Sequence, residues 1–333
     1  FTEPWINGAD TRDYTTSTAL SVEGEYVIRI SANDYLISSD EHTNKVAMDT
    51  YSSNKIIIDT TAPVITAEYS PATPAAGSTA YPDTRTVVFS ITEKYFNPEN
   101  LSFSSFSATD VEGNPLPNAD EVKAELLAAI GSDDTWTHDG DLHVSSEIPF
   151  DTEARYIFTL TCTDYAGNLG TYLESTPFTV DKSSPNNVQI AYKTNPVSTF
   201  LQVITFGFYK PSVTIELYAD DAVSGVGHFN WTFTREDGSS TTLNVPTESA
   251  QIDSTDTGHF RYENNGKTAV ATLTLTADEF AQYRGSISFT VTDKAGHTSA
   301  AHYGDGTAKD ENGNQYNTDP DHVIVVDTIS PTR

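Results

Sequence analysis

The feature that most constrains this chain is a short phrase that occurs three times along its 333 residues. Each copy is an apolar, β-branched strand followed by Asp, a short polar spacer and Pro, and the copies span residues 56–63, 178–185 and 324–331. Pro lacks a backbone N–H and favours extended conformations in the residue before it, so each strand must end at the spacer. The phrase therefore predicts a strand that leaves one domain and a taut link into the next.

A second phrase, Asp-x-Ala-Gly-Asn, lies upstream of the later copies. It spans residues 164–168, returns at 293–297 with His297 in place of the Asn, and has a partial counterpart at Asp34. Each instance follows an alternating strand. Strand, turn, strand and link thus form one supersecondary unit that is repeated three times along the chain. Such repeats determine the architecture of the whole fold.

We therefore expect an all-β fold of tandem β-sandwich domains with short helical insertions. The first unit, 1–61, reads as the C-terminal part of a truncated domain or as a shortened domain with an early strand at 2–6. The second unit is 62–182. The third unit is 183–333 and carries a polar insertion near 303–321.

Strand candidates are short, alternate in polarity and are bounded by Pro, Gly and Asn, which is typical of sandwiches. They are 15–20, 26–30 and 55–58; then 65–69, 86–92, 101–106, 142–148, 155–161 and 176–180; then 188–192, 203–208, 213–218, 228–234, 241–245, 269–275, 287–291 and 323–326.

Residues 118–130 break this period with apolar residues at helical spacing, and Asn118 with Glu121 forms an N-cap signal. A helical turn is expected at 276–279. Trp231 alternates with Phe229 and Phe233, which predicts a core position.

The formal net charge of −29 argues against nucleic acid or an anionic membrane as a partner. No apolar run of ~18 residues is present, so no membrane insertion is expected. The single cysteine, Cys162, forms no intrachain disulfide and is expected to be buried. Avoidance of cysteine fits both a bacterial surface without disulfides and the cytosol.

The repeated motifs resemble those of bacterial immunoglobulin-like repeats in large cell-surface proteins and adhesins. Asp-Thr-Thr-Ala-Pro at 59–63 and Thr-Asp-Tyr-Ala-Gly-Asn at 163–168 carry the resemblance. It implies tandem immunoglobulin-like sandwiches on a bacterial surface. Tyr26 and Tyr156 lie where a tyrosine corner is expected, and the third unit has Gly285 there.

The sequence contains no strong catalytic or metal-binding motif of a known family. No Gly-x-Ser-x-Gly elbow is present, and the histidines lack a known ligand spacing. The densest histidine cluster, 138–143, is read as a solvated turn rather than a zinc site. The stretch 310–314 imitates the start of a calcium loop, but its Gly is misplaced and no Glu closes it. We expect no enzyme activity.

The joints between units carry the best candidate sites, because strand direction predicts which loops meet there. The linker Asp of one unit should approach the end of the second strand and the Asp-x-Ala-Gly turn of the next. The predicted groups are Asp59, Glu93 and Asp164 at the first joint, and Asp181, Asp220, Asp221 and Asp293 at the second. Converging carboxylates repel unless a cation such as Ca²⁺ holds them, but Asp residues also cap turns without any metal. Both interpretations stay open.

The sequence favours a non-catalytic extracellular stalk whose partners are neighbouring repeats of the same chain. One alternative is a module that binds a host glycan or protein through the aromatic stretches 95–96 and 206–209. Another is an accessory region of a secreted glycoside hydrolase.

Overall fold

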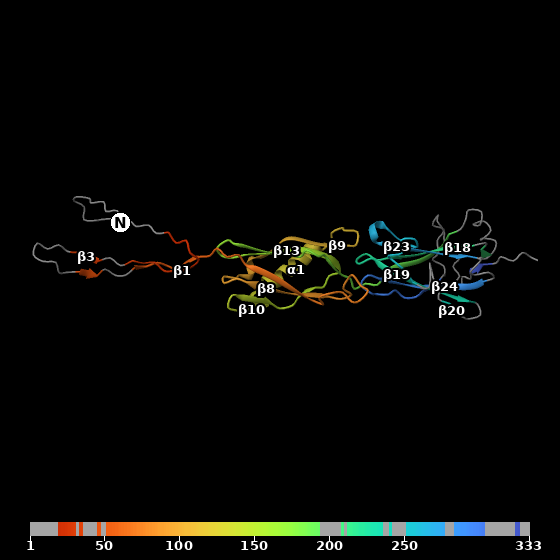
Figure 1. The fold of residues 1–333 in the computed structure, drawn as a ribbon, viewed down its shortest axis with the longest axis horizontal. Helices are drawn as coiled ribbons and strands as arrows, with labels where there is room; N and C mark the ends of the chain where they lie inside the picture. Colours follow the sequence, from red (N-terminus) through yellow and green to blue (C-terminus); the bar gives the residue numbers. More distant parts are fainter. Residues whose placement is uncertain are drawn as a thin grey trace, which may run out of the picture.

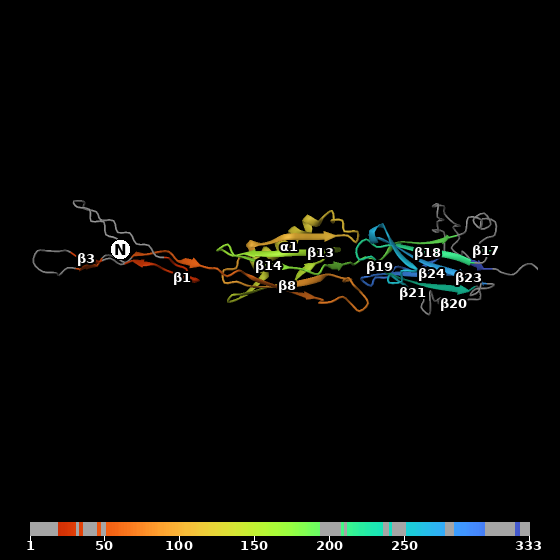
Figure 2. The ribbon, with the colours of Figure 1, turned by 45° about the horizontal axis from the view of Figure 1, so that its top comes forward.

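The computed structural model describes residues 19–30, 33–35, 45–47, 51–193, 208–209, 212–235, 240–241, 251–276, 283–303 and 324–326. Strands dominate these residues, and α1 (Ala119–Gly131) is the one α-helix among them, so the expected all-β class is confirmed. The units follow one another along the long axis of an extended molecule (Figures 1 and 2).

The second unit is built from two sheets. Its strands are β7 (Val64–Ser70), β8 (Arg85–Thr92), β9 (Leu101–Thr109), β10 (Trp136–Asp139), β11 (Leu142–Ser145), β12 (Ile148–Phe150), β13 (Ala154–Thr163), β14 (Leu169–Leu173) and β15 (Phe178–Val180). One sheet has the order β10-β11-β8-β12 with β7 also paired to β8, and the other has the order β14-β13-β15 with β9 also paired to β13. All these pairings are antiparallel.

Alternation along β8 and β13 explains why the two sheets face each other. Val87, Phe89 and Ile91 are buried on β8, and Tyr156 and Phe158 are buried on β13, while the residues between them are more exposed. Side chains of a strand point alternately to its two faces, so each strand offers one apolar face to a shared core. These residues belong to one hydrophobic cluster that draws on both sheets.

The helix predicted at 118–130 is confirmed as α1. It buries Val122, Leu126 and Ile130, which lie four residues apart on one face, and it contacts β9 and β12. Asn118 is the N-cap residue, but its side chain makes no capping hydrogen bond. No helix among the described residues is long and apolar enough to cross a membrane. Short 3-10 turns, η1 (Pro98–Asn100) and η2 (Asp133–Thr135), flank the insertion.

The third unit has its own core. Its strands are β16 (Asn186–Lys193), β17 (Phe208–Tyr209), β18 (Ser212–Asp220), β19 (Val226–Arg235), β20 (Ser240–Thr241), β21 (Gln251–Asp253), β22 (Phe260–Glu263), β23 (Thr268–Thr276), β24 (Tyr283–Asp293), β25 (His302–Tyr303) and β26 (Ile324–Val326), with the 3-10 turn η3 (Asn264–Gly266) before β23. One sheet runs β16-β18-β23-β22 and the other runs β17-β26-β24-β19-β20, with β21 on β19 and β25 on β24. Trp231 is 1% exposed and packs in this core with Phe229, so its predicted burial is confirmed.

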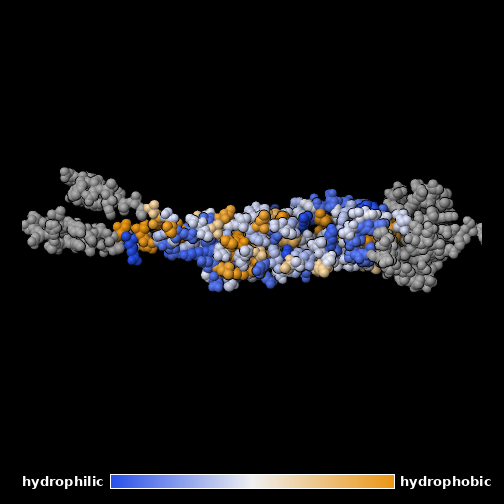
Figure 3. All heavy atoms as spheres, in the orientation of Figure 1, coloured by the Kyte–Doolittle hydropathy of each residue, from blue (hydrophilic) through white to orange (hydrophobic). Residues whose placement is uncertain are grey.

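The described part of the first unit is a narrow ribbon. Its strands are β1 (Gly24–Tyr26), β2 (Arg29–Ile30), β3 (Asn33–Tyr35), β4 (Lys45–Ala47), β5 (Tyr51–Ser52) and β6 (Ile56–Ile58), paired as β1-β6, β2-β5 and β3-β4. Val22, Val27 and Ile57 are exposed, and Figure 3 shows hydrophobic surface over this ribbon. Two-stranded ribbons bury little, and no described residue of this unit belongs to a hydrophobic core.

Tyr26 and Tyr156 make the hydrogen bond expected of a tyrosine corner. The hydroxyl of Tyr26 donates to the carbonyl of Val22 at 2.6 Å, and that of Tyr156 donates to the carbonyl of Thr152 at 2.6 Å. Each bond returns four residues along the chain and holds the entry to a strand in place.

Several strand predictions were incomplete. The candidate 26–30 is divided between β1 and β2, and the candidate 142–148 is divided between β11 and β12, where the backbone N–H of Ser146 donates to the carbonyl of Thr135. The strands β3, β4, β5, β10, β14, β21, β22 and β25 were missed, and β3 contains Asp34, where a partial copy of the turn motif was predicted. The candidates at 15–20 and 203–208, the helical turn at 276–279 and the insertion at 303–321 lie wholly or mostly outside the described residues.

Candidate metal sites at the two joints

The first joint brings together the three acidic residues predicted to meet there. Asp59 follows β6, Glu93 follows β8 and Asp164 follows β13. Each offers a carboxylate oxygen, and these oxygens lie within 4.8 Å of one another. Glu93 and Asp164 are buried and Asp59 is half-buried, so the group lies between the ribbon and the second unit.

Turn capping accounts for part of this arrangement. Asp59 Oδ1 accepts from the N–H of Thr61 at 3.1 Å, and Glu93 Oε1 accepts from that of Tyr95 at 2.8 Å. Asp164 Oδ1 accepts from the N–H groups of Ala166 and Asn168, both at 2.8 Å. These hydrogen bonds show that all three residues cap turns, and each of the bonds uses only one oxygen of its carboxylate.

The side chain of Asn168 completes the first joint. Its Nδ2 donates to Asp164 Oδ2 at 2.8 Å and to the backbone carbonyl of Asp59 at 3.2 Å. Burial opposes ionisation of Asp164, but the hydrogen bonds from Asn168, Ala166 and Gly167 outweigh it and lower the pKa of that carboxyl. The turn thus reaches across the joint to the linker.

The pKa of the Glu93 carboxyl is shifted in the opposite direction, upward. Burial raises the pKa of its carboxyl, the hydrogen bond from Tyr95 opposes that rise, and the neighbouring charges of Asp59 and Asp164 add to it. A group whose charged form is disfavoured in this way is stabilised by a cation placed nearby.

Charged residues surround the first joint. Glu25 Oε2 lies 2.7 Å from Lys55 Nζ, and its Oε1 lies 3.3 Å from Lys94 Nζ and accepts from the hydroxyl of Tyr95 at 2.7 Å. The hydrogen bond from Lys55, followed by those from Tyr95 and Lys94, lowers the pKa of Glu25 to about 2. These contacts link the ribbon to the second unit beside a groove of about 310 Å³ that Asp59 and Glu93 line.

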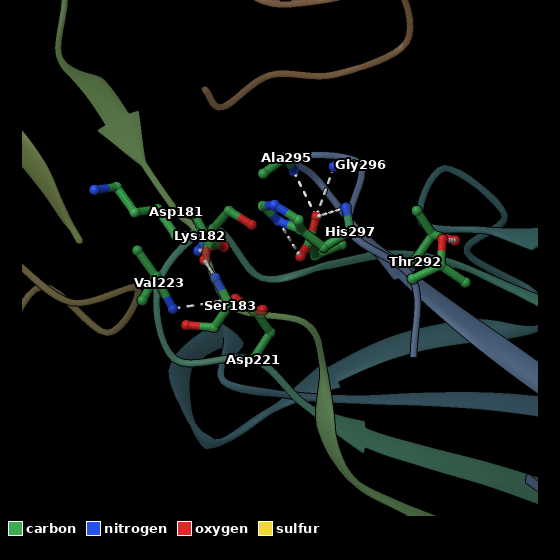
Figure 4. A network of polar contacts seen from close by, with 12 residues as sticks. Asp181, Lys182, Ser183, Asp221, Val223, Thr292, Ala295, Gly296 and His297 are labelled. Atoms are coloured by element: carbon green, nitrogen blue, oxygen red, sulfur yellow. Dashed lines mark hydrogen bonds and ion pairs between the residues drawn. The ribbon is translucent and has the colours of Figure 1, made fainter. Parts of the chain in front are cut away.

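The second joint buries its acidic residues more deeply. Asp181 follows β15 and is 0% exposed, Asp221 follows β18 and is 2% exposed, and Asp293 ends β24 and is 4% exposed. Asp181, Asp293 and His297 each offer one ligand atom, and these atoms lie within 4.8 Å of one another. Figure 4 shows how Asp181, Asp221 and His297 lie around this point.

Backbone N–H groups cap the carboxylates here as well. Asp181 accepts from Ser183 on Oδ1 and from Ser224 on Oδ2, both at 3.1 Å. Asp221 Oδ1 accepts from Val223 at 3.1 Å and from Gly225 at 2.6 Å. The bond from Ser224 to Asp181 crosses the joint, because the linker residue binds a loop of the third unit.

The crowded charges oppose one another. Burial raises the pKa of Asp181 to about 6, the hydrogen bond from Ser224 works against that rise, and the charges of Asp221 and Asp293 add to it. Burial also raises the pKa of Asp293, against the hydrogen bonds from His297 and Gly296. Asp181, Asp221 and Asp293 therefore meet in a space where their mutual repulsion is poorly screened.

The structure does not bring Asp220 into the group formed by Asp181, Asp293 and His297. Its carboxylate accepts instead from Asn187 Nδ2 at 2.8 Å and from Thr268 Oγ1 at 2.6 Å. Asp220 is the last residue of β18, while Asp221 lies in the loop that follows and is 2% exposed. His297 was not predicted as a member of this group, although its place in the repeated turn marked it.

Backbone hydrogen bonds also close the second joint. The N–H groups of Thr79 and Ala80 donate to the carbonyl of Lys294 at 2.9 and 3.2 Å, and that of Val111 donates to the carbonyl of Ala222 at 3.0 Å. Two loops of the second unit thereby contact two loops of the third.

The aromatic and histidine clusters considered as binding sites are partly structural. The ring of Phe96 stacks on His143 at 4.7 Å and contacts Trp136 at 4.8 Å between ring centroids. His143 is buried, so the reading of 138–143 as a solvated turn was wrong for this residue. Its Nδ1 lies 2.6 Å from Nδ1 of His138. Phe206 and the side chains of Phe208 and Tyr209 lie outside the described residues.

Comparison with known proteins identifies no family. No family model matches the chain, and no curated protein matches it. The site is therefore interpreted from its geometry alone.

Proposed function

We propose that this chain is a non-catalytic stalk segment of a bacterial surface protein, an adhesin, exposed outside the cell. In this proposal the units 62–182 and 183–333 are tandem immunoglobulin-like β-sandwich domains, and 1–61 is the C-terminal part of a preceding one. The proposal rests on the repeated link and turn, and on the tyrosine corners of Tyr26 and Tyr156.

The observation that carries a stalk is the interlocked second joint. A flexible linker would leave neighbouring domains free to rotate. Here the linker residue Asp181 is fully buried and accepts a hydrogen bond from Ser224, and loop backbones on both sides are hydrogen-bonded. Such a joint resists bending, and resistance to bending is what a spacer needs.

We also propose that the joints hold divalent cations, with Ca²⁺ at the first. Ca²⁺ takes ~6–8 oxygen ligands from carboxylates, carbonyls and water. Asp59, Glu93 and Asp164 offer carboxylates within 4.8 Å of one another, and the raised pKa of Glu93 is the response of a carboxyl that lacks a counter-charge. Bound cations would offset the repulsion and stiffen the rod.

Small-angle scattering of the full chain tests the stalk. We expect one extended profile, a larger spread of dimensions in EDTA, and recovery on addition of Ca²⁺. Asp59→Asn should weaken the response of the first joint, and the same change at the distant exposed Asp83 serves as the matched control. A compact or widely bent ensemble in Ca²⁺ would contradict the stalk. Specific binding to a glycan array, lost on Tyr95→Ala, would favour a binding module instead.

A further inference from the structure

The two joints differ at the fifth residue of the repeated turn, and that position faces the candidate metal site. The fifth residue of the turn is Asn168 at the first joint and His297 at the second. Both turns are closed by the same backbone bond, since the N–H of Asp164 donates to the carbonyl of Asn168 at 3.1 Å and the N–H of Asp293 donates to the carbonyl of His297 at 3.0 Å. The difference is therefore one of side-chain chemistry on a matched backbone.

The exchange leaves the aspartate of the second turn without a hydrogen-bond donor on one oxygen. Asp293 Oδ1 accepts from the N–H groups of Ala295, Gly296 and His297 at 2.8, 2.6 and 2.9 Å. Its Oδ2 is buried and has no hydrogen-bond partner among the described residues, whereas Asp164 Oδ2 accepts from the amide of Asn168.

The imidazole of His297 also has a buried polar atom that forms no hydrogen bond among the described residues. Its Nδ1 is buried without a hydrogen-bond partner and lies 3.4 Å from Asp293 Oδ2. Asp293 Oδ2 and His297 Nδ1 thus face one another without the geometry of a hydrogen bond. Asp181 offers the third ligand atom of the group (Figure 4). The two atoms are within ion-pair distance but share no hydrogen bond, and buried polar groups normally have one, so a cation that binds both atoms would stabilise the pair.

The donor set indicates which ion fits. Protein ligands bind Zn²⁺ at roughly 2.0–2.2 Å, and neighbouring ligands of a tetrahedral ion are then about 3.4 Å apart. The separation of Asp293 Oδ2 from His297 Nδ1 is 3.4 Å. Imidazole nitrogen suits borderline transition metals, while Ca²⁺ takes oxygen ligands, which are all that the acidic group of the first joint offers.

We propose that the second joint binds a borderline divalent transition-metal ion, of which Zn²⁺ is the type, through Asp181, Asp293 and His297. Water would complete the coordination. Asp221 lies close enough to add negative charge, while its Oδ1 is held by Val223 and Gly225. This inference rests on the proposed function only in placing a cation at the joints, and it gives the two joints different ion preferences.

Calorimetry on the full, metal-stripped chain tests the proposal, with ZnCl₂ and CaCl₂ titrated separately. We expect Zn²⁺ to bind the wild type, and His297→Asn, which installs the residue of the first joint and removes a direct ligand, to weaken that binding by more than the ~10–100-fold that loss of a supporting outer-shell residue costs. Co²⁺ in place of Zn²⁺ should give the visible absorption of a tetrahedral site, and this absorption should be lost in the same variant.

Controls separate this site from others. His138→Gln removes the exposed histidine of the His138–His143 pair and should leave Zn²⁺ binding unchanged. His297→Gln is a second variant in case His297→Asn alters folding, which circular dichroism checks. Equal Zn²⁺ affinity in wild type and His297→Asn, loss of binding only in His138→Gln, or no Zn²⁺ binding at all would each overturn the proposal.

Failure here is distinguishable from failure of the stalk. An extended scattering profile in a chain that takes no Zn²⁺ would overturn the transition-metal site and leave the stalk standing. A compact ensemble with Zn²⁺ binding that depends on His297 would support the site and overturn the stalk.

Discussion

Gly170→Ala is predicted to force the linker of the first joint out of place. Gly170 lies on β14 opposite Cys162, and a Cβ added there would be 2.2 Å from the carbonyl oxygen of Pro63 and 2.9 Å from its Cβ. The nearest atoms belong to the backbone and ring of the linker, so no flexible side chain can move aside. Either the linker or β14 must shift by about 1 Å to restore van der Waals contact.

The expected cost follows from overpacking. Extra methylene volume in a packed site typically costs ~1–3 kcal/mol. Since about 1.4 kcal/mol corresponds to a factor of ten, the unfolded fraction of the second unit should rise roughly 5- to 150-fold. Gly131→Ala is the matched control, because a Cβ added there would lie 4.0 Å from the carbonyl oxygen of Pro98, an ordinary van der Waals contact.

Cys162 provides the assay. It is the only cysteine of the chain, it is 0% exposed, and it lies in the core of the second unit, so thiol labelling of the full chain reports the opening of that unit. Labelling of Gly170→Ala should be faster than that of wild type and Gly131→Ala. Labelling rates within about twofold of each other in all three proteins would refute the packing of Pro63 against β14.

Four further predictions concern the cores and the units. Trp231→Ala should cost ~3–5 kcal/mol of unfolding free energy in urea titration, because a buried ring is replaced by a cavity; wild-type stability would contradict its core position. Tyr156→Phe should cost ~1–1.5 kcal/mol through loss of its hydrogen bond to Thr152, measured in the same way, and an unchanged midpoint would argue against the tyrosine corner. Burial raises the pKa of the Cys162 thiol from 9.0 to about 11, so alkylation of the native chain should stay slow until that pH is approached. The folded state keeps a proton that the unfolded chain loses, so the free energy of unfolding should fall as pH rises from 9.0 to about 11. A free energy of unfolding that does not change over this pH range would count against the burial of Cys162. Residues 62–182 should melt cooperatively in isolation and residues 1–61 should not, because a ribbon without a core is marginal in water; a cooperative melt of 1–61 by circular dichroism would refute this.

Much of the fold could be predicted from periodicity. The alternation in β8 and β13 and the helical spacing in α1 marked their core faces, because burial of one face leaves a regular apolar pattern. The missed strands β10, β14 and β22 lack such a pattern. In β10 only Trp136 is buried, so the strand exists through its pairing with β11 and not through an apolar face.

The meeting of acidic residues at the joints could be predicted because antiparallel strands alternate in direction. Once Asp59 was placed at a linker, the ends of β8 and β13 had to lie beside it. The side to which each carboxylate turns could not be predicted. Asp220 and Asp221 are neighbours with the same chemistry, but Asp220 ends β18 and binds Asn187, whereas Asp221 begins the next loop, caps it through Val223 and Gly225, and lies near Asp181.

The sequence by itself determined the repeat, the links, the all-β class and the acidic character of the joints, because these depend on residue type and on local order along the chain. The tertiary structure decided which atoms remain without partners. Asn168 and His297 occupy one position of the same turn, yet the side chain of Asn168 donates a hydrogen bond to its aspartate, whereas that of His297 lies 3.4 Å from an aspartate oxygen without forming one. That difference arises from distances across the joint, measured between residues far apart in sequence, and no local pattern encodes them.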